Sequence, residues 1–149
     1  MLILIEYWQT DSDEVSFIDT DPKSINAEYI YPQNPEAGSE WEKMFKNGDE
    51  YLNTLGNMAL LSGAKNRYAQ NFTFKEKISI YQGFDKNGNK ASGKSGKITV
   101  YLSTQQIIND YKANTFKQRW NEKVVQARFN WLCEQIGNVL NINVSSILY

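Results

Sequence analysis

The chain contains no histidine among its 149 residues, and this absence limits the chemistry available to it. A serine or cysteine nucleophile activated by an imidazole is excluded, because both arrangements need a histidine. The sequence also lacks a glycine-rich phosphate loop, a Cys/His metal cluster and a nucleophile elbow.

Cysteine is nearly absent too. Cys133 is the single cysteine, so the chain cannot form an internal disulfide. Its apolar neighbours, Trp131 and Leu132, predict a buried, unreactive thiol. No apolar run is long enough to cross a bilayer, and the apolar start, Met1–Ile5, has no basic region before it. We therefore expect a cytoplasmic protein with no membrane partner.

The composition is that of a folded chain. Hydrophobic residues make up 41 % of the sequence and aromatic residues 13 %, enough for a core without disulfides or metals. The length predicts a single domain over residues 1–149.

A net charge of −1 conceals an asymmetry along the chain. Residues 1–56 carry a charge of −9, residues 57–97 carry +6 and residues 98–149 carry +2. Because charges are screened beyond about 8–10 Å, a local basic stretch matters more for phosphate binding than the total does. The basic segment indicates either a phosphate-binding surface or a solvated lysine-rich loop. The near-zero total argues against strong non-specific binding to nucleic acid.

The N-terminal half contains two predicted strands. Residues 1–8 are apolar apart from Glu6 and predict either a buried strand or the end of a helix. Residues 25–31 alternate in polarity and predict a strand that ends at Pro32, because proline cannot donate to a strand ladder. Residues 55–61 predict a second short strand. Between the strands, Ser39 is a candidate N-cap for a short helix over residues 40–46, with Asn47-Gly48 as its stop.

Residues 72–81 are ambiguous. Alternation at Ile78 and Ile80 favours a strand that pairs with residues 98–102 across a turn-rich connection. Further on, Ser103 or Thr104 is a candidate cap for a helix. Apolar residues at spacings of three and four then predict a long amphipathic helix over residues 117–140, with the tail 141–149 packing back.

Two segments carry a recognisable motif. Glu28-Tyr29 is followed by Pro32-Gln33-Asn34-Pro35, and the second segment contains Leu55-Gly56-Asn57 and then Leu60-Leu61; Asn66, Asn71 and Phe74-x-x-Lys77 follow. This arrangement resembles the C-terminal domain of GmrSD-type restriction endonucleases, which is an HNH-like nuclease domain. The family pattern has Glu-His where this chain has Glu28-Tyr29.

The resemblance implies an α+β fold. Its centre would be an HNH-like ββα hairpin-helix unit packed against the C-terminal helices, and this favours a helix over residues 72–81. In such nucleases a histidine deprotonates the attacking water, and a divalent metal, Mg²⁺ or Mn²⁺, stabilises the charge on the phosphate.

The resemblance also assigns candidate site residues. Tyr29 holds the histidine position, and Asn57, Asn66 and Asn71 hold the positions of the family asparagines. An imidazole has an ordinary pKa of about 6.5 and a phenol of about 10, so replacing the first by the second removes a base that works at neutral pH. The identity of any metal ligand stays open. Without the resemblance, the asparagines are also typical of turns and loops.

Basic residues flank these asparagines. Lys65, Arg67, Lys75 and Lys77 are the candidate DNA-binding residues, since phosphate contacts position DNA without reading its sequence. The alternative for each is a lone surface cation.

The functional hypothesis is a catalytically degenerate HNH-like domain of a bacterial or phage restriction or defence system, acting in DNA binding or complex assembly. It is either free-standing or the C-terminal part of a longer restriction protein, with an N-terminal nucleotide-dependent domain or a partner subunit supplying other activities. The alternative is a regulatory module that binds an active nuclease or another protein, which the acidic first third favours. Metal-dependent cleavage with Tyr29 as the base also stays open.

Overall fold

The computed structural model describes residues 1–11, 17–21 and 23–144. Within them the elements follow one another along the chain as helices and two short strands: α1 (Leu2–Gln9), β1 (Asn26–Tyr29), α2 (Glu40–Met44), α3 (Gly48–Leu52), η1 (Leu55–Asn57), β2 (Met58–Leu61), α4 (Gly63–Ala69), α5 (Phe74–Tyr81), η2 (Gly93–Gly96), α6 (Leu102–Lys112) and α7 (Glu122–Leu140).

The two strands form an antiparallel pair, which confirms the α+β class. Asn26 lies opposite Leu61, and Tyr29 lies opposite Met58. Both strands are shorter than predicted. The segment before β2 winds into the 3-10 turn η1, and the pairing beyond β1 continues through one bond from the Ile30 amide to the Asn57 carbonyl.

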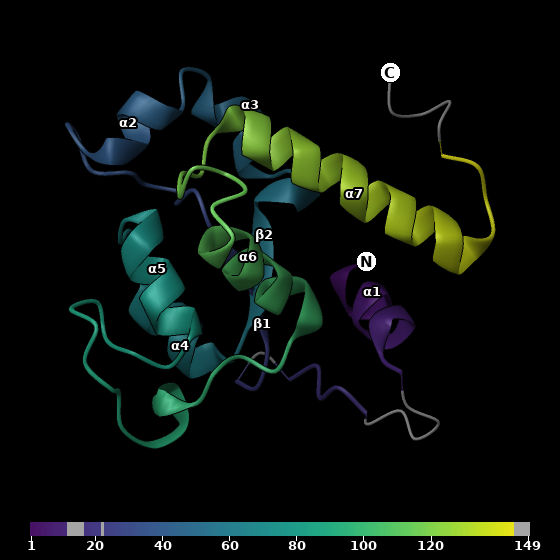
Figure 1. Cartoon of the computed structure of the whole chain (residues 1–149), viewed down its shortest axis with the longest axis horizontal. Coiled ribbons are helices and arrows are strands. Elements are labelled where there is room, and N and C mark those ends of the chain that lie inside the picture. Colours follow the sequence, from purple (N-terminus) through teal and green to yellow (C-terminus); the bar gives the residue numbers. More distant parts are fainter. Residues whose placement is uncertain (12–16, 22, 145–149) are drawn as a thin grey trace.

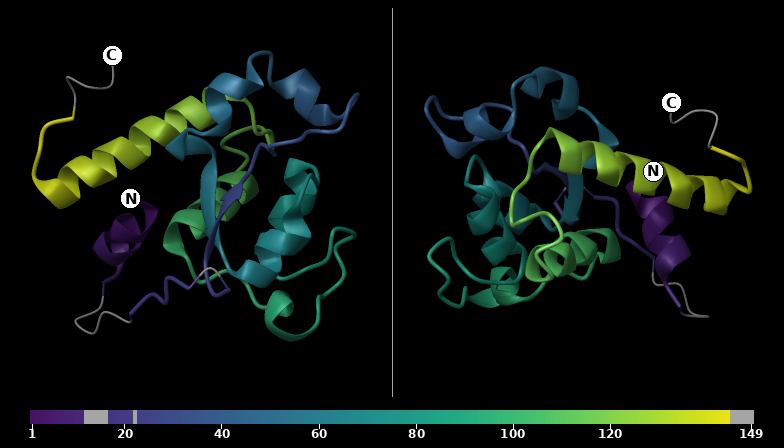
Figure 2. Two further views of the ribbon diagram at one scale, coloured as in Figure 1. Left: turned by 180° about the vertical axis from the view of Figure 1, so that it is seen from behind. Right: turned by 45° about the horizontal axis from the view of Figure 1, so that its top comes forward.

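The antiparallel strand pair, here called the hairpin although α2, α3 and η1 connect its strands, lies between two groups of helices (Figures 1 and 2). Alternation places Glu28 and Ala59 on one face and Ala27 and Leu60 on the other. The first face borders the larger core, built with α5, α6 and the start of α7. The second face borders a smaller core, in which Leu60 packs with Leu2 and Ile5 of α1.

Helix α7 crosses the end of the hairpin and touches η1 (Figure 1). Gly56 of η1 makes this contact possible. A Cβ atom added at Gly56 would lie 2.2 Å from the carbonyl oxygen of Val125, which belongs to the α7 backbone. The close approach of two backbones therefore explains the glycine of the Leu-Gly-Asn motif.

The apolar N-terminal segment is a helix, which settles the alternative left open by its pattern. Glu6 of α1 is buried, and its carboxylate accepts hydrogen bonds from the amides of Leu102 and Ser103 at 2.6 and 2.9 Å and from the Ser103 hydroxyl. Helix α6 therefore begins one residue before Ser103. Its cap is a carboxylate from α1, not the side chain of Ser103 or Thr104 that the sequence predicted.

Residues 74–81 form helix α5, so the strand alternative is wrong and the helix is confirmed. Thr73 accepts a bond from the Glu76 amide while the Glu76 carboxylate accepts from the Thr73 amide, a complete capping box. Residues 98–101 form no strand. They are tied to α5 by a bond from the Thr99 amide to the Tyr81 carbonyl.

Other boundaries differ as well. Helix α2 ends at Met44, and Gly48 begins α3 instead of ending a helix; neither α3 nor α4 was predicted. Helix α7 begins at Glu122, because Lys117 and Gln118 have positive φ angles that an α-helix cannot contain. Asn121 caps it through the Val124 amide.

The C-terminal end follows the prediction only in part. The thiol of Cys133 is half-buried, not fully enclosed, and burial raises its pKa, which lowers its reactivity. Of the tail, residues 145–149 lie outside the described residues, and Ile142 is 52 % exposed. No helix within the described residues combines the length and apolar character needed to cross a membrane.

Candidate functional site

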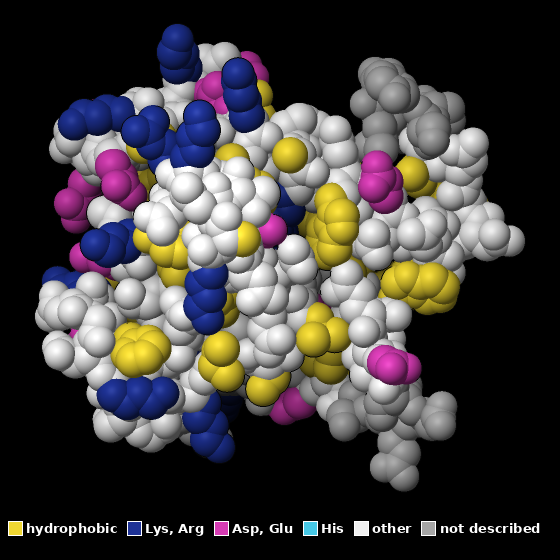
Figure 3. Space-filling view, viewed as in Figure 1, with side chains coloured by type: hydrophobic (Ala, Val, Ile, Leu, Met, Phe, Trp, Pro, Cys, Tyr) yellow, Lys and Arg dark blue, Asp and Glu magenta, His cyan; other side chains and the backbone are white. Residues whose placement is uncertain are grey.

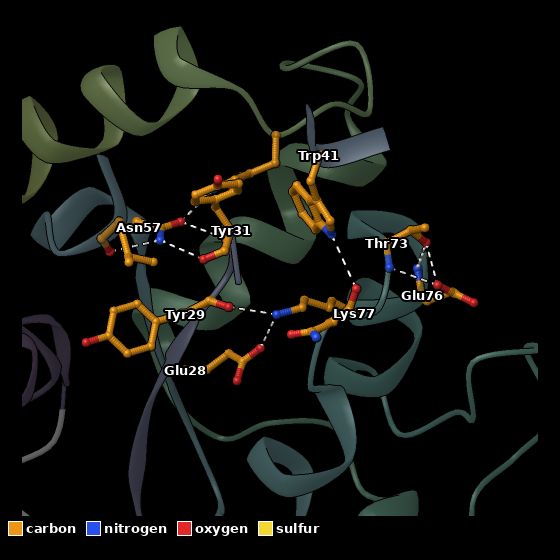
Figure 4. A network of polar contacts seen from close by, with 11 residues as sticks. Glu28, Tyr29, Tyr31, Trp41, Asn57, Thr73, Glu76 and Lys77 are labelled. Carbon is orange, nitrogen blue, oxygen red and sulfur yellow. Dashed lines mark hydrogen bonds and ion pairs between the residues drawn. The ribbon is translucent and has the colours of Figure 1, made fainter. Parts of the chain in front are cut away.

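Tyr29, which the resemblance assigned to the histidine position, is the last residue of β1. Its ring is half-buried, and its hydroxyl donates a hydrogen bond to Asn53 Oδ1 at 3.2 Å. Its backbone carbonyl faces the opposite way and accepts a bond from Lys77 Nζ at 2.7 Å. Figure 4 shows the ring directed away from Lys77. The phenol and the neighbouring carboxylate of Glu28 therefore lie on different faces of the strand.

Glu28 and Lys77 form a buried ion pair. Lys77 Nζ lies 2.5 Å from Glu28 Oε1, and the two residues are 0 % and 5 % exposed (Figure 4). Burial raises the pKa of the carboxyl and lowers the pKa of the amine, while the attraction between the two groups opposes both changes. The pair joins β1 to α5, and removing one partner would leave a buried charge uncompensated.

Asn57 connects three parts of the core. Its Oδ1 accepts bonds from the Tyr31 amide at 2.8 Å and from Trp120 Nε1 at 3.2 Å. Its Nδ2 donates to the carbonyls of Tyr31 and Leu52 at 3.0 and 3.1 Å. The side chain is 0 % exposed, and every donor and acceptor of the amide is used. Asn57 therefore fixes the chain beyond β1 against η1, α3 and the segment before α7 (Figure 4).

The other two asparagines lie elsewhere. Asn66 is on α4 and half-buried, and its Oδ1 is a buried atom without a hydrogen-bond partner among the described residues. Asn71 is exposed in the turn before α5, where its backbone carbonyl accepts a bond from Trp41 Nε1 at 3.4 Å. The four candidate residues thus occupy four different environments, and no hydrogen bond joins Tyr29 to the asparagines at 57, 66 or 71 in the described structure.

The four candidate cations divide into two kinds. Arg67 and Lys75 are exposed, whereas Lys65 and Lys77 are buried, which corrects the expectation of one surface group. Lys65 Nζ donates to the carbonyls of Ile80 at 2.5 Å and Ser95 at 3.1 Å. Burial, with a smaller contribution from the charge of Lys90, lowers its pKa to about 8. Lys65 therefore fastens the segment after α5 to the end of that helix.

The motif residues do not supply the ligands that a divalent metal needs. The carboxylate of Glu28 is already neutralised by the ammonium of Lys77, and the oxygen of Asn57 accepts two bonds inside the core. No three Asp, Glu, Cys or His side chains lie close enough to hold a metal within residues 1–11, 17–21 and 23–144. The donor set present here does not fit a hard cation, which prefers several oxygen ligands.

One central polar residue of the fold, Arg128, was not among the candidate site residues. Arg128 of α7 is buried and donates to the carbonyls of Leu55, Gly56 and Ser103, so it joins α7 to η1 and to α6. Burial lowers its pKa to about 10. Its position at the same spacing as Val124 and Leu132 places it on the apolar face of α7, and this spacing was the available signal.

The motif therefore consists largely of residues that determine the fold. Gly56 allows α7 to approach, Asn57 satisfies backbone groups of the core, and Lys77 neutralises Glu28. Of the four candidate site residues, Asn71 is exposed, Tyr29 and Asn66 are half-buried and Asn57 is buried, and a neutral amide or phenol is a weak base.

Comparisons with known proteins agree with the motif. Residues 1–135 match the family model of GmrSD restriction endonucleases, C-terminal domain. No curated protein matches the chain significantly, and no solved structure does. Because the family model spans the hairpin, the helices around it and most of α7, the chain belongs to the family of GmrSD restriction endonuclease C-terminal domains.

Proposed function

We propose that this chain is a DNA-binding domain of a restriction or defence system, built on an HNH-like scaffold whose nuclease chemistry has been lost. The loss is supported by the contacts of two motif residues. The phenol of Tyr29, which the resemblance assigns to the histidine position, is bonded to Asn53, and the adjacent carboxylate of Glu28 is paired with Lys77. General-base catalysis contributes about 10²–10⁴-fold to enzymatic rates, and this site offers no group suited to it at neutral pH.

DNA binding is supported by the distribution of exposed cations. Within residues 57–97, Lys65 and Lys77 are used inside the fold, and the described side chains that remain at the surface are Arg67, Lys75, Lys86, Lys90 and Lys97. Figure 3 shows Lys and Arg side chains concentrated on the half of the molecule that α2, α5 and the following loop occupy, away from α1 and the C-terminal end of α7. Such cations gain affinity for DNA by releasing counterions from its phosphates.

Two assays test this proposal. A labelled DNA duplex should bind with an affinity that falls steeply as salt rises, and Lys75→Glu should weaken binding more than Lys123→Glu on the exposed side of α7. Plasmid nicking in Mg²⁺ or Mn²⁺ should be absent. Nicking that disappears in Tyr29→Phe would instead make Tyr29 a working base, and duplex affinity that does not change with salt would argue against phosphate binding.

A second candidate function is supported by a different surface. Met1, Leu4 and Trp8 are 62 %, 44 % and 53 % exposed, and their spacing places them on one side of α1. Together with the acidic first third of the chain, this favours a protein partner, such as a partner subunit or the N-terminal nucleotide-dependent domain that the family implies. Leu4→Glu should release such a partner in a co-purification assay without changing the affinity for DNA. If Lys75→Glu releases the partner and Leu4→Glu does not, the basic side is the protein interface.

A further inference from the structure

Aromatic rings and cations alternate on the surface formed by the end of α4, the turn after it and the loop that follows α5. Tyr68 and Phe84 are 38 % and 36 % exposed, and Phe72 is half-buried. We call this the aromatic–basic surface, and its residues are Arg67, Tyr68, Phe72, Phe84, Lys86 and Lys90.

Contacts join five of these residues into two groups, Tyr68 with Phe72 and Lys86, and Phe84 with Lys90. The rings of Tyr68 and Phe72 meet edge to face with centroids 5.7 Å apart. Lys86 Nζ lies 5.1 Å from the centroid of Phe72, and Lys90 Nζ lies 5.2 Å from that of Phe84. Each ring at the surface therefore has a cation or a second ring beside it.

The loop that carries Lys86 and Lys90 is held in shape by its own hydrogen bonds. Asp85 Oδ1 accepts from the amides of Asn87 and Asn89, both at 2.8 Å, and Phe84 forms a β-bridge with Lys90. The carboxylate of Asp85 is thus turned toward the loop backbone. At the far end, Lys65 bonds the carbonyls of Ile80 and Ser95. A loop fixed in this way loses little conformational entropy when a ligand binds.

We propose that the aromatic–basic surface binds single-stranded nucleic acid, with bases stacked on its rings and phosphates beside its cations. This inference rests on the proposed function, because it names the form of nucleic acid that the basic side of the molecule receives. A base in a duplex has both faces covered by its neighbours and presents only its edges to a protein. A base in a single strand has free faces, and every base can stack on an aromatic ring.

The existing cation–π contacts do not prevent a base from stacking on these rings. An exposed contact of this kind contributes a factor of about 2–5 to an equilibrium, whereas stacking one base on an aromatic side chain contributes about 5–150-fold. When a base takes the face of Phe72 or Phe84, the displaced ammonium of Lys86 or Lys90 remains within reach of the adjoining phosphate. The observed pairs therefore place a stacking ring and a phosphate-binding cation side by side.

Fluorescence anisotropy with three labelled probes tests the proposal: a 20-residue oligothymidylate, a 20-residue oligouridylate and a 20-base-pair DNA duplex. We expect a single-stranded probe to bind more tightly than the duplex. The single strand with the higher affinity shows whether the surface prefers DNA or RNA. Phe84→Ala should weaken that binding at least fivefold, and Phe84→Trp should preserve it. Lys86→Ala and Lys90→Ala should each reduce the slope of log K against log salt by about 0.7, whereas Lys123→Ala should not.

The outcomes separate this inference from the proposed function. Duplex binding that exceeds single-strand binding would overturn the inference and leave the proposed function intact, and binding of none of the probes would overturn both. If Phe84→Ala and the unchanged protein bind the single-stranded probe with equal affinity and have matching thermal melting curves, Phe84 does not stack on a base. Competition by polyglutamate as strong as competition by oligothymidylate would show a purely electrostatic surface and would also overturn the inference.

Discussion

Replacing Asn57 by alanine provides the sharpest test of the view that the motif now maintains the fold. The change removes an amide that is 0 % exposed and takes the partner from three buried groups, the amide and carbonyl of Tyr31 and the indole N–H of Trp120, and from the partly buried carbonyl of Leu52. A buried polar group left unsatisfied costs about 1–3 kcal/mol. A water molecule entering the vacated space can satisfy part of this set, so the four costs do not add fully.

We therefore expect Asn57→Ala to lower the free energy of unfolding by about 3–5 kcal/mol, a large part of the roughly 5–15 kcal/mol typical of a domain. At about 2–4 °C per kcal/mol for a chain of this size, the melting temperature should fall by roughly 6–20 °C. Urea denaturation followed by tryptophan fluorescence measures the first quantity, and circular dichroism measures the second.

A matched variant is available in the same motif. Asn71→Ala changes an exposed side chain and should alter stability by no more than about 0.5 kcal/mol. Asn57→Asp keeps the acceptor for the Tyr31 amide but sets a carboxylate oxygen against two carbonyls, so it should be less destabilising at acid pH, where it is protonated. If the free energy of unfolding of Asn57→Ala is within 1 kcal/mol of that of the unchanged protein, the amide does not hold these segments of the core together.

Further predictions concern other residues of the fold and the site. Gly56→Ala should lower stability by about 1–3 kcal/mol or more in urea denaturation, because its Cβ would meet a helix carbonyl at 2.2 Å. Glu6→Gln should cost about 1–3 kcal/mol, measured in the same way, since it removes a charged cap of α6. The pKa of Lys65 is lowered from 10.5 to about 8, so above pH 8 the unfolded chain binds more protons at this residue than the folded chain does. Its contribution should therefore raise stability as pH increases from about 8 to 10.5, and this increase should be missing in Lys65→Met. Tyr29→His should not by itself produce metal-dependent plasmid nicking, because Glu28 stays paired with Lys77; nicking by this variant would mean that a working metal site survives.

The hairpin could be predicted from the sequence because its signals are local. Alternating polarity followed by Pro32 marks β1, and Ser62-Gly63 marks the end of β2. The helix over residues 74–81 also had a local signal, because Thr73 and Glu76 have the spacing of a capping box, which a strand would not use. The start of α6 had no such signal, since its cap comes from Glu6, ninety-six residues before Leu102.

Counting charges along the chain does not show that Lys65 and Lys77 are buried. The burial of one of them could nevertheless have been predicted from the sequence. Once residues 74–81 are a helix, Lys77 falls on the same stripe as Phe74, Ile78 and Tyr81, so its buried position follows from the helical period. A carboxylate on a facing element is a natural partner for a buried ammonium, and Glu28 is the acid that the alternation of β1 turns inward. Lys65 gives no such signal, because the carbonyls that hold its ammonium come from the end of α5 and from Ser95, and their positions depend on the path of the loop between them. A buried lysine with a carboxylate partner can thus be deduced from helical and strand periodicity, whereas a buried lysine held by backbone carbonyls requires the tertiary structure.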